Sequence, residues 1–256
     1  MTRGPPTVRP SPGYGDGVAR IEELAWQDTP LGEINLRRRQ DPVLGRDVYE
    51  VKLGDEFLMS SAFTAAEEAL ARLALAELSG SELRVAVGGL GLGYTAAAVL
   101  EDPRVGSLVV IDALKPVIDW HEQGLIPSGA VLVEDPRCRL VEGDFFALVR
   151  AGALDVTGGI RRFDAVVVDI DHSPTHVLDP ANLWQYTLEG TRALLPLLVP
   201  GGVFALWSND PPDAGYTALL QQVFDTARAD VVAFPNPLQG RDSTNTVYVA
   251  IAPAAA

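Results

Sequence analysis

Residues 83–100 read LRVAVGGLGLGYTAAAVL, and this stretch sets the architecture of the chain. The apolar run Leu83–Val87 is typical of a buried strand, and Tyr94–Leu100 is typical of a helix. The turn between them contains four glycines. Glycine lets the backbone approach a ligand closely, and the helix N-terminus offers N–H groups to a carboxylate or phosphate. A tight turn also needs glycine for its own geometry, so the motif gains meaning only from its context.

After this turn, short apolar runs alternate with helical patterns. The expected strands are residues 107–111, 139–141, 163–168, 203–207, 230–234 and 246–251. The expected helices are residues 116–123, 145–150, 183–197 and 216–227. Continuous apolar strands separated by helices indicate a parallel sheet covered on both faces. The pattern predicts an α/β, Rossmann-like fold with a seven-stranded, mostly parallel sheet, and it resembles the class I methyltransferase fold.

The region before the turn has a different character. Residues 1–18 are rich in proline and glycine, without periodicity, and predict a disordered tail. Strand-like runs at 21–27, 33–39 and 47–53 predict a small antiparallel β domain over residues 19–62. The third unit, residues 63–256, is expected to bind an adenosyl cofactor and carry the catalytic residues. Its first helix is expected over residues 64–78, because Thr64 and Glu67 have the spacing of a capping box.

The composition excludes several classes of protein. The 256 residues include one cysteine, Cys138, which rules out a disulfide framework and a cysteine-rich metal site. No run reaches the roughly 18 apolar residues that span a bilayer. The net charge of −14 would repel a phosphate backbone, although Arg37, Arg38 and Arg39 form a short basic run. We therefore expect a cytoplasmic protein that binds neither nucleic acid nor membrane. The acidic surface favours solubility or a cationic small molecule.

Acidic residues follow the next two strands. Asp112 ends the strand about 20 residues after the glycines, the spacing at which a carboxylate accepts hydrogen bonds from ribose hydroxyls. Asp144 follows the next strand and is either an acceptor for an adenine amino group or a helix N-cap. A nicotinamide oxidoreductase would also show the glycine turn and the acid at Asp112.

A catalytic residue is expected where the strand 163–168 ends. Asp169 should point into the crevice that the glycine turn faces, because ligands lie beyond the carboxyl ends of parallel strands. It is expected to take a proton from a nucleophile or to hold a cationic acceptor. His172 is a second catalytic candidate, as a general base, or else a surface histidine of a loop that also holds His176.

Three further polar residues are candidates for binding the substrate. Asp171 is one of them, although its alternative interpretation is a solvent-facing loop residue. Asn209 and Asp210 follow the strand 203–207 and would line the acceptor pocket, or form an ordinary Asn-Asp-Pro turn. Together with Asp169 they could supply oxygen ligands to a divalent cation. No metal site is predicted, because no recognisable ligand spacing is present.

Together these residues resemble the spermidine synthase family from about residue 25 onwards. The motifs that carry the resemblance are the strand meander, Glu67-Glu68, the glycine turn, residues 110–112 (VID), Gly143-Asp144, the strand ending at Asp169, residues 183–186 (LWQY) and residues 198–202 (LVPGG). The sequence departs from the family at the turn, where Gly91 replaces the acid that would hold the cofactor's aminopropyl ammonium group. His172 lies near the place of a second family acid, and residues 63–67 lack the family's tyrosine.

The resemblance implies a transferase that binds an adenosyl sulfonium cofactor. Gly89, Gly91 and Gly93 would hold one end of it, and Asp112 and Asp144 the other. Without an acid at 91, free glycine N–H groups would accept a cofactor carboxylate, which favours intact S-adenosylmethionine. We therefore expect methyl transfer to a small-molecule acceptor such as an amine. The alternatives are a polyamine aminopropyltransferase that uses decarboxylated S-adenosylmethionine, and a non-catalytic relative. The resemblance also implies a homodimer.

Overall fold

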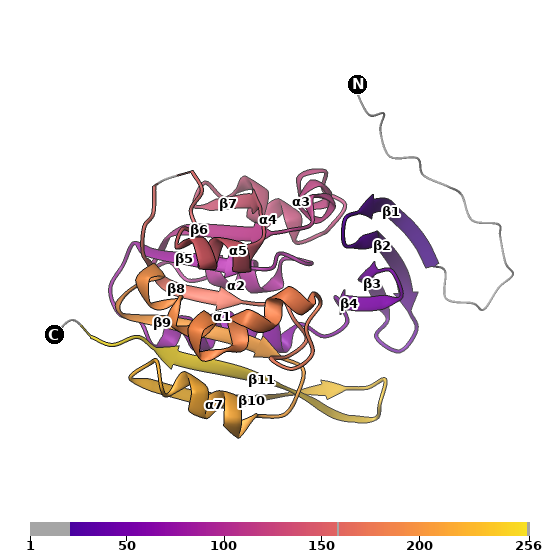
Figure 1. The fold of residues 1–256 in the computed structure, drawn as a ribbon. Helices are drawn as coiled ribbons and strands as arrows, with labels where there is room; N and C mark the ends of the chain where they lie inside the picture. Colours follow the sequence, from indigo (N-terminus) through magenta and orange to yellow (C-terminus); the bar gives the residue numbers. More distant parts are fainter. Residues whose placement is uncertain (1–20, 158, 255–256) are drawn as a thin grey trace, which may run out of the picture.

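The computed structural model describes residues 21–157 and 159–254, which form two β-sheets and the helices around the larger one (Figure 1). The expected tail, residues 1–18, lies outside the described residues. Within the described ranges, no helix has the length and apolarity needed to cross a membrane.

The larger sheet has seven strands in the order β10-β11-β9-β8-β5-β6-β7. All the pairs from β9 to β7 are parallel, whereas β11 pairs antiparallel with both β9 and β10. The fold predicted from the sequence is therefore confirmed. The strands are β5 (Leu83–Gly88), β6 (Val105–Asp112), β7 (Cys138–Glu142), β8 (Phe163–Val168), β9 (Leu198–Ser208), β10 (Thr226–Asn236) and β11 (Arg241–Ile251).

Both faces of this sheet are buried because successive side chains of each strand enter opposite layers. In β5, Val85 and Val87 pack into one hydrophobic cluster while Ala86 packs into the other. One cluster includes α1 (Ala65–Ala76), α2 (Tyr94–Leu100), α3 (Lys115–Glu122) and α4 (Gly129–Glu134). The other includes α5 (Phe145–Ala151), α6 (Leu188–Arg192), α7 (Ala214–Leu220) and the 3-10 turns η1 (Pro180–Tyr186) and η2 (Leu195–Leu197).

The expected helix 183–197 is broken into short pieces. Thr187 is extended, with φ −87° and ψ 166°, and its hydroxyl caps α6 by accepting from the Gly190 N–H. Asp179 caps η1 in the same way through the Ala181 N–H. Two separate caps therefore divide the segment where apolar spacing alone predicts one helix. The last expected helix, 216–227, is also shorter, because α7 ends at Leu220.

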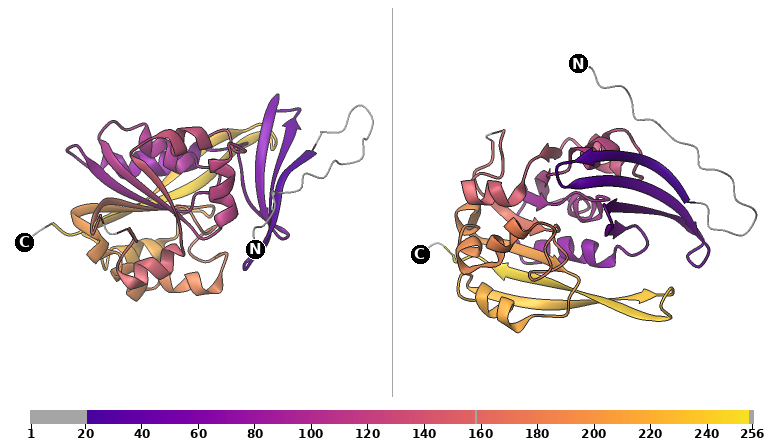
Figure 2. Two further views of the ribbon diagram at one scale, coloured as in Figure 1. Left: turned by 90° about the horizontal axis from the view of Figure 1, so that it is seen from above. Right: turned by 45° about the vertical axis from the view of Figure 1, so that its right-hand side comes forward.

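The smaller sheet is an antiparallel meander of four strands at one end of the larger sheet (Figure 2). It contains β1 (Ile21–Thr29), β2 (Gly32–Asp41), β3 (Arg46–Leu53) and β4 (Glu56–Ser60). The first three correspond to the expected strand runs, and β4 is an addition that the sequence pattern did not reveal. Through Val51, Leu58 and Met59 this sheet closes a cavity at the carboxyl ends of the parallel strands.

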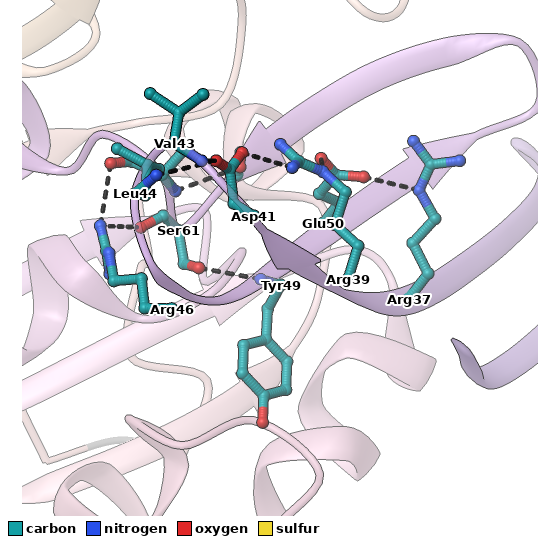
Figure 3. A network of polar contacts seen from close by, with 11 residues as sticks. Arg37, Arg39, Asp41, Val43, Leu44, Arg46, Tyr49, Glu50 and Ser61 are labelled. Carbon is teal, nitrogen blue, oxygen red and sulfur yellow. Dashed lines mark hydrogen bonds and ion pairs between the residues drawn. The ribbon is translucent and has the colours of Figure 1, made fainter. Parts of the chain in front are cut away.

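The basic run of β2 is neutralised by acids of the same sheet (Figure 3). Arg37 and Arg39 lie on one face, and each donates from Nε to a carboxylate oxygen of Glu50 at 2.7 Å. Arg39 also pairs with Asp41 at 2.5 Å. Arg38 points to the other face and pairs with Glu22 at 2.6 Å. All three arginines therefore form ion pairs within the N-terminal sheet.

Candidate active site

A cavity of about 380 Å³ lies where the glycine turn, the ends of β6 and β8, and the N-terminal sheet meet. Its walls are largely apolar, and the charged residues among the described lining are six acids and no lysine or arginine. Such a lining favours a cation, because a carboxylate ligand would meet uncompensated negative charge. The acids are Glu67, Asp112, Asp144, Asp169, Asp171 and Asp179.

The glycine turn needs its glycines for packing as well as for access to the cavity. Gly89 and Gly91 line the cavity and have φ values of 91° and 47°. A Cβ at Gly89 would lie 2.0 Å from the Asp169 carbonyl oxygen. Gly93, with φ 85°, packs against His121 and Leu132 and does not line the cavity. The structure therefore brings two of the three predicted cofactor-binding glycines to the site.

The N–H groups of this turn already have partners. The Gly89 N–H donates to the Ile111 carbonyl at 2.8 Å, and the Gly93 N–H donates to the Leu90 carbonyl at 2.7 Å. The Leu90 N–H donates to Asp112, and the Leu92 N–H donates to the Met59 sulfur, both at 2.8 Å. Gly89 and Gly93, two of the three predicted cofactor-binding glycines, therefore have no free N–H group to offer a cofactor carboxylate.

Asp112 ends β6, with one carboxylate oxygen toward the glycine turn and the other toward the loop that follows it. One oxygen accepts from the Leu90 N–H and the other from the Leu114 N–H, each at 2.8 Å. Burial nevertheless raises the pKa of Asp112 above its usual value. Each carboxylate oxygen can accept a second hydrogen bond. Asp112 is thus held in place with capacity left for a ligand hydroxyl.

Asp144 is the helix N-cap that the sequence offered as one of two interpretations. Its Oδ1 caps α5 by accepting from the Ala147 N–H at 3.0 Å. The same residue is exposed and lines the cavity. Helix capping uses one oxygen and leaves the other available to a ligand.

Asp169 follows β8 directly and lines the cavity, as expected. Its backbone N–H donates to the Gly88 carbonyl at 2.8 Å, which fixes it beside the glycine turn. Its Oδ2 accepts from the Thr95 hydroxyl at 2.6 Å. Burial raises the pKa of Asp169 to about 6, and the Thr95 hydrogen bond opposes that rise. A carboxylate with such a pKa is ionised at neutral pH and is a suitable proton acceptor.

Glu67 was missed as a site residue because it was interpreted as part of a capping box. Thr64 makes no side-chain cap; its hydroxyl donates to Glu68 at 3.0 Å, while Glu67 lines the cavity. Burial, and then the charge of Asp169, raise the pKa of Glu67 to about 8. A sequence signal existed, because Glu67 shares the helical face of Leu70 and Ala74, which are buried.

The loop after Asp169 is fixed by its own polar contacts. Asp171 is buried rather than solvent-facing and accepts from the Tyr186 hydroxyl at 2.7 Å, the Asn182 side chain at 2.9 Å and the Leu178 N–H at 2.8 Å. His172 lines the cavity, and its Nε2 lies 3.0 Å from the Glu56 carboxylate in β4. Asp171 therefore shapes the loop, and His172 connects it to the N-terminal sheet.

Asn209 and Asp210 are exposed and do not line the cavity. The Asn209 amide oxygen accepts from the Asn245 side chain at 3.1 Å, and the Asp210 carbonyl accepts from the Thr246 hydroxyl at 2.7 Å. Both residues fasten the turn after β9 to β11, so the structure does not bring them into the predicted acceptor pocket. Among the residues that the structure describes, no group of three or more His, Cys, Asp or Glu side chains is placed to hold a metal ion.

The apolar wall was also missed, because it comes from segments far apart in the sequence. Phe145 and Phe146 begin α5, Trp207 lies in β9, and Met59 lies in β4. Met59 lies against the turn so closely that a Cβ at Gly91 would overlap its sulfur. Trp120, Trp184 and Tyr186 do not line the cavity.

Comparison with known proteins identifies relatives by sequence. No protein-family model matches the chain. A polyamine aminopropyltransferase of Nitrosomonas europaea is 28% identical over 207 residues, which cover 78% of this chain and 57% of that protein. A polyamine aminopropyltransferase of Mycobacterium tuberculosis is 28% identical over 127 residues, covering 50% of this chain and 23% of its own length. The match thus spans 57% of the length of the first relative and 23% of the length of the second.

Solved structures share the fold. A spermidine synthase in complex with the transition state analogue AdoDATO has a TM-score of 0.69 and 19% identity, covering 90% of this chain and 73% of that one. The spermidine synthase of Thermotoga maritima has a TM-score of 0.67, also at 19% identity, covering 90% and 72%.

These comparisons correct the expected reaction. Both sequence relatives are named for aminopropyl transfer, and both structural neighbours are spermidine synthases. The preference for methyl transfer is therefore wrong. It depended on free glycine N–H groups at the turn, and those of Gly89 and Gly93 donate to carbonyl groups of the protein. The sequence matches and the shared fold together confirm that the chain resembles the spermidine synthase-like family.

Proposed function

We propose that the protein is an aminopropyltransferase that moves the aminopropyl group of decarboxylated S-adenosylmethionine to a small amine. The observation that carries this proposal is the charge of the cavity, whose described lining has six acids and neither lysine nor arginine. Both reactants of such a transfer are cations, and neither has a carboxylate. The names of the sequence relatives support the same reaction.

The adenosyl part of the cosubstrate fits the residues present. Asp112 has acceptor capacity for ribose hydroxyls, and Asp144 lines the cavity with one carboxylate oxygen that helix capping does not use. Ile111, Leu114 and Phe145 provide apolar surface for a flat base. The bound sulfonium would supply a carbon activated for displacement, because loss of the carbon–sulfur bond leaves a neutral thioether.

The chain's own contribution is to hold the reactants, exclude water and accept a proton. Asp169 is the proposed proton acceptor for the attacking amine, and Thr95 orients its carboxylate. Holding two reactants in an aligned geometry can lower a barrier by about 7–11 kcal/mol, so modest acid-base chemistry suffices. His172 and Asp171 are proposed to set the loop that encloses the acceptor.

The test is an assay of the purified chain with decarboxylated S-adenosylmethionine and putrescine, with products identified by mass spectrometry. We expect spermidine and methylthioadenosine in equal amounts, and no methylated amine when intact S-adenosylmethionine is supplied. If the chain binds the nucleoside but transfers nothing to a panel of di- and polyamines, it is a non-catalytic relative. The expected homodimer and the cytoplasmic location stay predictions, which sedimentation and cell fractionation would test.

A further inference from the structure

We propose that Glu67 is a specificity-determining residue of this cavity and binds, together with Asp169, a primary alkylammonium group of the ligand. The inference deepens the proposed function and rests on it for the identity of the ligands. Two sources offer this group: the aminopropyl chain of the cosubstrate and one end of the amine acceptor. The structure assigns the shared chemistry, and the experiment separates the sources.

The position of Glu67 comes from the packing of α1 against α2. The Thr95 hydroxyl in α2 lies 2.6 Å from an Asp169 carboxylate oxygen and 3.4 Å from the Glu67 carbonyl oxygen. One small side chain therefore contacts both residues, which come from α1 and from the end of β8. Both acids line the cavity beside Gly89 and Tyr94.

Within the described residues, no basic side chain forms an ion pair with Glu67 or Asp169, whereas Asp41, Glu50, Asp155 and Asp164 each pair with an arginine. The groups facing Glu67 are Asp169, the neighbouring Glu68 and the phenol of Tyr94. None of them supplies positive charge at neutral pH. Two half-buried carboxylates that face each other repel, and the arrangement is relieved by a shared proton or by a cation between them.

The glycine turn offers no competing anchor for that cation. Gly91 has no side chain, and the space where one would begin is occupied by the Met59 sulfur. The next carboxylate along the turn is Asp112, whose two oxygens accept from backbone N–H groups. An alkylammonium group near the turn therefore has the Glu67–Asp169 pair as its charged partner.

The first experiment measures binding by calorimetry with three probes: decarboxylated S-adenosylmethionine, methylthioadenosine, whose tail is neutral, and putrescine. Glu67→Gln should weaken binding of at least one alkylammonium probe by tenfold or more, while methylthioadenosine binds as in the wild type. Weaker binding of decarboxylated S-adenosylmethionine would show that Glu67 binds the aminopropyl chain of the cosubstrate. Weaker binding of putrescine would show that it binds the amine acceptor. Glu68→Gln is the matched control, because Glu68 is adjacent, carries the same charge and already pairs with Arg72.

A second readout uses the wild-type protein and so does not depend on the variant folding. Because the pKa of Glu67 is raised to about 8, it is largely protonated at pH 7 in the free cavity. An ammonium group bound beside it should expel up to one proton, detected as a binding enthalpy that depends on the ionisation enthalpy of the buffer. Methylthioadenosine should release none, and Glu67→Gln should abolish the release.

Unchanged affinities in Glu67→Gln together with no proton release in the wild type would overturn the inference. If aminopropyl transfer were observed all the same, the proposed function would stand without it. Conversely, Glu67-dependent binding of an alkylammonium probe by a chain that catalyses no transfer would support the inference and overturn the proposed function.

Discussion

In the N-terminal sheet, the Glu50 carboxylate is 5% exposed and accepts from two arginines, whereas in the cavity Glu67 and Asp169 face each other without any basic partner among the described residues. Both places hold carboxylates away from bulk water. Burying a charge is costly unless a partner compensates it. The charge of Glu50 is compensated by two arginines, whereas the charges of Glu67 and Asp169 have no compensating cation in the part of the chain that the structure describes. The difference separates acids that stabilise the fold from acids available to a ligand.

The largest expected effect is the loss of aminopropyl transfer when the Asp169 carboxylate is replaced by a neutral amide. Asp169→Asn should lower kcat about 10²–10⁴-fold, because the amine loses its proton acceptor, while Thr95 can still hydrogen-bond the amide oxygen. The measurement is initial rate against pH, with the melting temperature as a control for folding.

The pH profile sharpens this test. The pKa of Asp169 is raised to about 6, so kcat/KM should fall as the pH drops through about 6 and the carboxylate becomes protonated. Asp169→Asn should lack this limb. Since Asp169 and Glu67 interact, the apparent pKa belongs to the pair. A variant with full activity and an unchanged profile would contradict the catalytic role.

The second expected effect concerns the paired acid. Glu50→Gln should destabilise the fold by about 1–3 kcal/mol, because Arg37 and Arg39 lose their common charged partner. Partial exposure of the two arginines, 30% and 22%, keeps the loss below that of a fully buried pair. Urea unfolding measures it. Methylthioadenosine affinity should not change, and a weakened affinity would show that the sheet and the cavity are not independent.

The third effect has the opposite sign, because the unpaired acid costs stability. The pKa of Glu67 is raised from its ordinary value of 4.5, so the folded state binds its proton more tightly than the unfolded state does. Stability is therefore lost as the pH rises from about 4.5 through about 8. Glu67→Gln should remove this loss and stabilise the free protein at pH 9 by about 1–2 kcal/mol, with little difference at pH 4.5.

Thermal unfolding at several pH values checks this prediction. Glu68→Gln serves as the control, since it weakens a partly exposed ion pair with Arg72 and should be neutral or slightly destabilising. A Glu67→Gln variant that is less stable than the wild type at pH 9 would show that the Glu67 carboxylate has a stabilising partner.

The same contrast explains what the sequence could and could not predict. The core strands were found because strands buried on both faces are continuous apolar runs, as in residues 163–168. The glycine turn, Asp112 and Asp169 followed from their places at strand ends. These are local signals combined with one general property of parallel sheets.

The remaining features depend on contacts between distant segments. Asp171 is buried because Tyr186 and Asn182 reach back to it. Glu67 has the spacing of a cap, and only the packing of α1 against α2 turns it into the cavity. The short strand β4, which supplies Met59 and Glu56, has no clear alternation in EFLMS. For Asp171 and Glu67 a nearby pattern suggested one role and tertiary packing determined another, whereas β4 had no local pattern to find.

The smallest expected effect is the change in stability on replacing Arg38, an exposed arginine of β2, and it is compared with the replacement of Arg39 in the same strand. Arg38 lies between Arg37 and Arg39 but points to the opposite face, where it is 39% exposed and pairs with Glu22, which is 48% exposed. Exposed ion pairs contribute little, because water screens them and both side chains lose freedom. Arg38→Ala should therefore change the free energy of unfolding by less than about 0.5 kcal/mol. Arg39→Ala, measured in parallel by urea unfolding, should cost several times more, because it leaves Asp41 and Glu50 short of a partner. Equal losses in the two variants would mean that burial does not distinguish the two faces, and the contrast between paired and unpaired acids would then lose its physical basis.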